Sequence, residues 1–298
     1  MISLVRRFTA GGALSVALAA LAACGTAQAP HAARPAPYEA TSIGPGSTAV
    51  APAPTATRAA PAPMLPQGRD GRAPVFFNGP RTQGKTVAFT FDADMTADEG
   101  DRAAKGERFD NPGLIDTLRS LDVPATVFMT GKWAETYPDE ARAMGQDPLF
   151  EIGNHSYSHY AFTHGCYGLP TVSNDKAASE LQRTEAAFTK AGVRNRVPYF
   201  RFPGGCYDNK VLRTLGALHV TAVQWDVVSG DAFASDANAV AQQVLKGVKP
   251  GSVVVMHCTR SAAPTTEHVV SEVVPELRKQ GYRFVKVSDM IRSANGRS

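Results

Sequence analysis

The sequence predicts an α/β fold, namely a distorted (β/α) barrel of about seven parallel strands. Short apolar runs rich in β-branched and aromatic residues alternate with segments of helical periodicity, which is the pattern of parallel βαβ units. About seven such strands are enough to close a sheet, or nearly to close it. Polar residues suited to chemistry stand where several of these strands end, as they do at the carboxyl face of a barrel.

The expected elements cover the chain from about residue 86 onward. Strands are expected at 86–91, 125–130, 150–153, 199–202, 220–226, 252–257 and 282–287. Helices are expected at 112–120, 137–144, 176–191, 209–218, 237–246 and 267–280. Strand and helix therefore alternate throughout this part of the chain.

The first residues predict export. Arg6 and Arg7 form a basic start, and the apolar run over 13–20 is too short to cross a bilayer. Small residues then precede Cys24, which resembles the signal of bacterial lipoproteins, whose cysteine is lipidated. We predict a signal peptide over 1–24 with Cys24 as the lipidation site, and an ordinary cleaved signal peptide is the alternative. The protein is expected to be a cell-envelope lipoprotein anchored at the outer side of the membrane, or to be secreted.

Residues 25–72 are expected to form a disordered tether. Their composition is mostly Ala, Pro, Thr and Gly, which cannot bury enough apolar surface to offset the entropy of ordering. Residues 73–298 are expected to form the folded domain. A net charge of +4 is too weak a bias to indicate nucleic-acid binding. We expect a monomer that touches the membrane only through its lipid.

The chain contains four cysteines. If Cys24 carries lipid, Cys166, Cys206 and Cys258 remain in an oxidising compartment, where any two of them could form a disulfide. The sequence does not fix the pairing. Because no Cys-x-x-Cys spacing occurs, a cysteine-based metal site is disfavoured.

Two histidines and two aspartates suggest a metal site. His155 and His159 are four residues apart, so on one helical turn both rings would project from the same face and suit Zn²⁺, or else Co²⁺ or Ni²⁺. Asp94 is the natural third ligand, and three ligands leave positions open for water and substrate. Asp92 could then accept a proton from the water. Taken singly, each pair could instead be solvated histidines or turn aspartates.

Five segments, taken in order, resemble a known family. They are Thr90–Asp94, Asn154–His159, Arg201–Gly204, Trp225–Asp231 and Val253–His257. Their order and spacing are similar to the five motifs of the polysaccharide deacetylases, the NodB-homology family 4 carbohydrate esterases. The resemblance covers about residues 85–291, and it implies that 73–298 is a metal-dependent catalytic domain with the barrel fold.

The resemblance also implies a role for each residue. Asp92 would be the base that activates water, oriented by a charged hydrogen bond from Arg201. Asp231 would pair with His257 and tune its pKa, and His257 would protonate the departing amine. A backbone N–H near Gly204, together with the metal, would stabilise the oxyanion. Asp94, His155 and His159 would hold the metal.

Three positions depart from the family pattern. Ala93 separates two aspartates that are commonly adjacent in the family. Gly204–Gly205 replaces a usual tyrosine, and Ala232–Phe233 replaces a usual tryptophan, which alters the walls of the expected sugar pocket.

The predicted reaction is metal-dependent hydrolysis of N-acetyl groups from an amino-sugar polymer, with release of acetate. Peptidoglycan is the expected substrate, with chitin-type oligosaccharides next. One alternative is an ester deacetylase acting on xylan or another acetylated polysaccharide. A second is a wall-binding protein that has lost catalysis, although a pure binder has no need of Asp92 or His257.

Overall fold

A computed structural model describes residues 61–296. The predicted signal peptide over 1–24, its Cys24 and residues 25–60 of the predicted tether lie outside the described residues. Residues 61–72 are described and contact the domain, because Tyr199 Oη donates to Pro63 O at 2.7 Å and Leu65 N donates to Thr221 Oγ1 at 3.3 Å. The packed chain therefore begins before the predicted boundary at residue 72.

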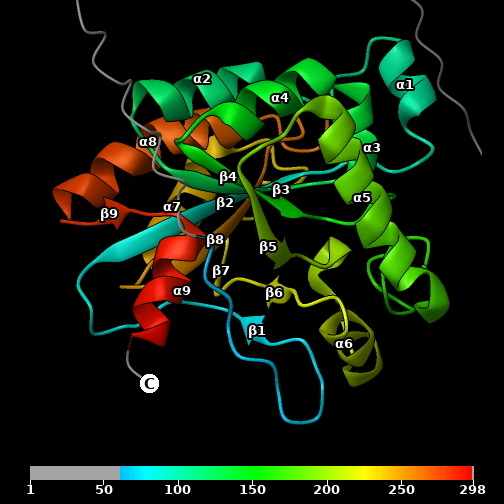
Figure 1. Ribbon diagram of the computed structural model, residues 1–298. Helices are drawn as coiled ribbons and strands as arrows, with labels where there is room; N and C mark the ends of the chain where they lie inside the picture. The colour runs from blue at the N-terminus through cyan, green and yellow to red at the C-terminus, as the bar shows by residue number, and fades with distance from the viewer. Residues whose placement is uncertain (1–60, 297–298) are drawn as a thin grey trace, which may run out of the picture. The chain divides into compact units, whose positions relative to one another are not determined.

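One parallel sheet organises the described residues (Figure 1). Its strands are β1 (Val75–Phe76), β2 (Thr86–Ala93), β3 (Ala125–Met129), β4 (Phe150–Asn154), β5 (Arg196–Phe200), β6 (Thr221–Val223), β7 (Val227–Val228), β8 (Ser252–His257) and β9 (Arg283–Phe284). Their order is β1-β6-β5-β4-β3-β2-β8-β7, and β9 pairs with β2. Every pairing is parallel, and β1 and β7 form the two ends of this order. The predicted distorted (β/α) barrel is confirmed, with nine strands rather than about seven.

Helices follow most strands. They are α1 (Gly100–Ala104), α2 (Pro112–Ser120), α3 (Gly131–Thr136), α4 (Pro138–Gln146), α5 (Ala177–Ala191), α6 (Asn209–Gly216), α7 (Ala237–Gly247), α8 (Thr266–Lys279) and α9 (Val287–Asn295). In Figure 1, α2, α4 and α8 lie on one side of the strands and α9 on the other. No helix among residues 61–296 is both long enough and apolar enough to cross a membrane.

Strand alternation sorts the side chains of β2 onto two faces. Val87, Phe89 and Phe91 join the apolar cluster formed with α2, α4 and α8. Ala88 joins a second cluster that contains residues of α9. Asp92 shares the face of Ala88, so the alternation directs its side chain away from the first cluster.

The last predicted strand is wrong beyond Phe284. Residues 282–287 were expected to be extended, but α9 begins at Val287, where Lys286 and Asp289 form a capping box. The expected strand over 220–226 is shorter in the structure, because β6 ends at Val223 and β7 begins only at Val227, with the side chains of Gln224 and Asp226 bonded between them. Gln224 Nε2 donates to Gly205 O at 2.7 Å, and Asp226 Oδ1 accepts from Val253 N at 2.7 Å.

Candidate active site

The predicted catalytic and metal-binding residues lie at the carboxyl ends of the strands. Asp92 belongs to the end of β2, His155 directly follows β4, and Arg201 directly follows β5. His257 is the last residue of β8 and stands in register with Asp92. Because all these strands are parallel, their ends meet at one edge of the sheet, as the sequence predicted.

Asp92 is buried and bound to a buried arginine. Arg201 Nη1 donates to Asp92 Oδ1 at 2.7 Å, and its Nε donates to Val223 O at 3.2 Å. The guanidinium lies over the Phe128 ring, 4.1 Å from the ring centroid. Burial alone would raise the pKa of Asp92, but the charge and hydrogen bond of Arg201, together with the charge of His257, outweigh burial and lower it. Asp92 is therefore a carboxylate at neutral pH and can accept a proton.

His155 has one ring nitrogen bonded and one free. Its Nδ1 lies 2.9 Å from Arg201 O, a carbonyl that can only accept, so Nδ1 carries the proton. Its buried Nε2 has no hydrogen-bond partner and lies 3.6 Å from Asp92 Oδ2. Burial lowers the pKa of His155 to about 4, which leaves the ring neutral at pH 7. A neutral imidazole with a free lone pair is the form that binds a metal.

The His155–His159 segment is not helical, contrary to the prediction. Ser156 and His159 have φ of 65° and 56°, in the left-handed region. Side chains hold this turn in place of helical bonds, because Glu180 Oε2 accepts from the N–H groups of Tyr157 and Ser158 at 3.0 and 2.8 Å. The ring centroids of His155 and His159 are nevertheless 4.9 Å apart.

Asp94 faces His159. Its Oδ2 lies 3.6 Å from His159 Nε2, while Thr259 Oγ1 donates to its Oδ1 and accepts from its N–H at 3.2 Å. Within residues 61–296, no three His, Cys, Asp or Glu side chains are grouped closely enough to hold a metal ion as they stand. The donor set nevertheless fits a divalent metal, since it offers two imidazoles, a carboxylate and an unpartnered buried nitrogen. The ligand roles of Asp94, His155 and His159 stay predictions.

Asp231 and His257 form the expected pair. His257 Nδ1 lies 2.8 Å from Asp231 Oδ1, and Asp231 Oδ2 accepts from the His257 N–H at 2.7 Å. Ser229 and Thr266 hydroxyls also donate to this carboxylate, at 2.8 and 2.7 Å. Burial alone would lower the pKa of His257, but the hydrogen bond and charge of Asp231 raise it to about 10. His257 is therefore an imidazolium at neutral pH and can donate a proton.

The cysteine pairing that the sequence left open is Cys166–Cys206. Cys258 is free and buried, and burial raises the pKa of its thiol well above the usual value. Gly204 lies beside the disulfide with φ of 64°, in a 3₁₀ turn over Pro203–Gly205. Its role in binding the oxyanion stays a prediction.

Several residues of the site were missed from the sequence. Thr259 holds Asp94, Ser229 and Thr266 hold Asp231, and Glu180 supports the histidine turn. Thr259 follows His257 by two residues, so its position next to a motif is a signal that could have been used. Glu180 offered no such signal, because its partners lie more than 20 residues away.

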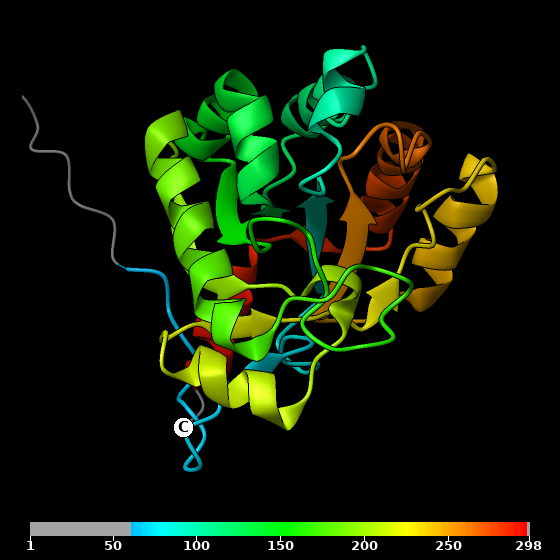
Figure 2. The same ribbon diagram turned by 90° about the vertical axis from the view of Figure 1, so that its right-hand side faces the viewer.

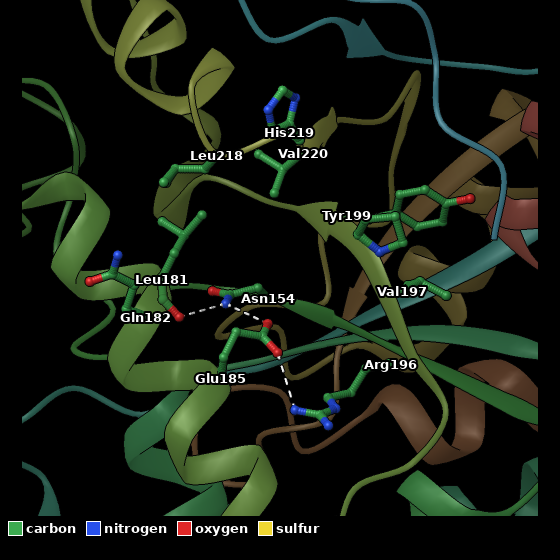
Figure 3. Close-up of a pocket in the computed structure, with 11 residues that line it drawn as sticks. Asn154, Leu181, Gln182, Glu185, Arg196, Val197, Tyr199, Leu218, His219 and Val220 are labelled. Carbon is green, nitrogen blue, oxygen red and sulfur yellow. Dashed lines mark hydrogen bonds and ion pairs between the residues drawn. The ribbon is translucent and has the colours of Figure 1, made fainter. Parts of the chain in front are cut away.

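A hollow of about 570 Å³ lies between α5 and β5, apart from the predicted catalytic residues (Figure 3). Asn154 at its wall donates from Nδ2 to Leu181 O and Glu185 Oε1, both at 3.1 Å. None of the predicted catalytic or metal-binding residues lines it. Asn154 also accepts from Ser156 N at 3.0 Å, so one residue of this wall contacts the histidine turn.

A buried carboxylate, a charged imidazole and a pair of histidines at the end of a parallel barrel are suited to hydrolysis. Residues 79–223 match the family model described as polysaccharide deacetylase. A peptidoglycan-N-acetylglucosamine deacetylase of Bacillus cereus is 27% identical over 188 residues, which are 62% of this chain and 65% of that protein. The predicted resemblance to the polysaccharide deacetylases and the predicted class of enzyme are confirmed, and the family match covers residues 79–223.

Solved structures share the fold. The Bc1960 peptidoglycan N-acetylglucosamine deacetylase has a TM-score of 0.62 and 25% identity, with 74% of this chain and 94% of that chain covered. BA3943 of Bacillus anthracis, described as a family pseudoenzyme, has a TM-score of 0.59 and 23% identity, with 74% and 69% covered. The second likeness concerns the fold alone.

Proposed function

We propose that this protein removes N-acetyl groups from the amino sugars of peptidoglycan by metal-dependent hydrolysis. One observation carries the proposal, namely that Asp92 and His257 stand in register on adjacent strands and have pKa values displaced in opposite directions. Two titratable groups whose environments separate their pKa values in this way are suited to act as base and acid.

Each of the two groups has a positioning partner. Arg201 keeps Asp92 charged and fixes one of its oxygens at 2.7 Å, which leaves Oδ2 to take a proton from water. Asp231 binds Nδ1 of His257 at 2.8 Å, which leaves the Nε2 proton for the departing nitrogen of the sugar. The products are acetate and a free amine.

Asp94, His155 and His159 would hold a divalent metal, Zn²⁺ in the first place and Co²⁺ or Ni²⁺ as alternatives. Such an ion, when bound, would make water more acidic and polarise the acetyl carbonyl. The neutral state of His155 and its unpartnered Nε2 support this assignment. The N–H groups near Gly204 are proposed to bind the developing oxyanion.

The name of the Bacillus cereus relative supports peptidoglycan as the substrate. Export through the segment over 1–24, which remains a prediction, would bring the enzyme to that polymer. The two charged pairs argue against a catalytically inactive wall-binding protein, because binding alone does not require a buried base opposite a charged imidazole.

The purified protein should be incubated with peptidoglycan, chitin oligomers and acetylated xylan, and released acetate measured. We expect release from peptidoglycan, its loss after chelation, and its return when Zn²⁺ is added. Release from xylan alone would favour the esterase. Absence of release from all three substrates, with every metal tried, would refute the proposal.

A further inference from the structure

A closed loop stands next to the candidate active site. Residues 160–172 leave His159 and return to α5, and in Figure 2 this loop crosses the front of the molecule. Its base is closed by two backbone bonds, Ala161 N to Pro170 O and Val172 N to Ala161 O, both at 2.8 Å. Its tip is tied by the Cys166–Cys206 disulfide to the segment that follows Arg201. The loop is therefore held at both ends.

Tyr167 at this tip is exposed and strained. Its side chain is 86% exposed, whereas its neighbour Cys166 is 2% exposed. Its φ is 49°, in the left-handed region that bulky residues avoid, and glycines with positive φ flank the pair at 165 and 168. An exposed ring adds little to the stability of the fold. The backbone strain at Tyr167 is not offset by packing of its ring. Such strain points to a function for the side chain.

The ring lies beside the backbone of Gly204. A Cβ atom built on Gly204 would stand 2.7 Å from Cys166 Sγ and 3.3 Å from Tyr167 Cδ2, so only glycine fits there. Gly204 is three residues from Arg201, which holds the proposed base Asp92. The ring thus lies beside the segment from Arg201 to Gly204 of the candidate active site, on a loop that begins after His159.

We propose that Tyr167 is a specificity-determining residue, a platform on which the sugar next to the acetylated unit of the glycan stacks. This proposal rests on the proposed deacetylase function. A pyranose ring presents an apolar C–H face that matches an aromatic ring, and the phenol can bond a sugar hydroxyl. The disulfide restrains the loop backbone that carries the ring, so less entropy is lost when the glycan docks.

The test distinguishes the contribution of the Tyr167 ring from that of the loop backbone. Asn tolerates the left-handed region, so Tyr167→Asn removes the ring without new strain, and Tyr167→Phe keeps the ring. Met64→Asn is the matched control, since Met64 is 43% exposed and lies beside Leu65, which binds Thr221 at the opposite end of the sheet.

With chitin pentasaccharide, Tyr167→Asn should raise KM about three- to tenfold with kcat little changed, because one stacked ring is lost. With the disaccharide the change should be smaller, and Tyr167→Phe and Met64→Asn should resemble the wild type. An unchanged KM for the pentasaccharide, in an enzyme that releases acetate, would overturn the platform and leave the deacetylase function standing.

Binding gives a readout that does not depend on turnover. Calorimetric titration of pentasaccharide into Asp92→Asn, with and without Tyr167→Asn, should show a Kd about three- to tenfold weaker without the ring. Equal Kd values, or no binding by either variant, would overturn the platform. Absence of acetate release by the wild type would refute the deacetylase function, and the Kd comparison would still decide the role of Tyr167.

Discussion

Replacing Asp231 by Asn tests whether His257 is the proton donor. Against the effect of burial, the hydrogen bond and charge of Asp231, with smaller contributions from Asp94 and Asp92, raise the pKa of His257 from 6.5 to about 10. That difference favours the imidazolium by about 5 kcal/mol at 1.36 kcal/mol per pH unit. Asn removes the charge but keeps the volume, and burial then opposes the remaining charges of Asp94 and Asp92, so we expect a pKa near 6.5. At pH 8 the protonated fraction falls to about 3%, so turnover should drop about 30-fold from this cause alone.

The assay is the pH profile of acetate release, together with the NMR titration of the His257 ring. The wild-type profile should keep its alkaline limb near pH 10, and the variant should lose activity above about 6.5. Thr266→Val is the control, because it removes one bond to Asp231 Oδ2 and leaves the charge. A wild-type His257 that titrates near 6.5, or a variant whose alkaline limb stays near pH 10, would refute the reasoning.

The same pair links stability to pH. A histidine whose folded pKa is raised stabilises the fold fully below its unfolded pKa, and this contribution is lost as pH rises through the folded value. The free energy of unfolding of the wild type should therefore fall between pH 6.5 and about 10. The Asp231→Asn variant should show a smaller decrease over that range.

The remaining predictions concern the base, the metal and the disulfide. Asp92→Asn should lower kcat at least about 100-fold, while Zn²⁺ content by mass spectrometry stays unchanged; loss of the metal would mean that Asp92 is a ligand. His155→Ala should lose Zn²⁺ on dialysis, and full retention of the ion would exclude His155 as a ligand. Replacing Cys166 and Cys206 together by Ser should lower the free energy of unfolding by up to about 4 kcal/mol, the loop-entropy value for a separation of 40 residues; urea denaturation with no change would contradict this account.

The sequence could predict that the site residues meet at one edge of the sheet, because this depends on local patterns. Apolar runs identify the strands, parallel order brings their ends together, and the polar residues follow within one or two positions. The Asp92–Arg201 and Asp231–His257 pairs agree with the roles expected of them. No contact between residues distant in the sequence had to be known in order to place these residues at one edge of the sheet.

The histidine turn and the disulfide could not be predicted, because long-range partners determine them. Glu180, more than 20 residues beyond the turn, takes the N–H groups that a helix would have used. The choice of Cys166 with Cys206 depends on how residues 160–172 return across Gly204. The error at α9 has a local cause, since Val287, Met290 and Ile291 are buried at helical spacing while residues 282–287 also alternate like a strand.

The spacing of the two aspartates, which departs from the family pattern, follows from the geometry of β2. Phe89, Phe91 and Ala93 point into the apolar cluster under the helices, and Ala93 is fully buried there. A carboxylate at position 93 would enter this cluster without a partner, at a cost of several kcal/mol. Asp94 directly follows β2, and its side chain turns toward the site, where Thr259 holds it opposite His159. An alanine between the aspartates is therefore what lets both carboxylates face the same site.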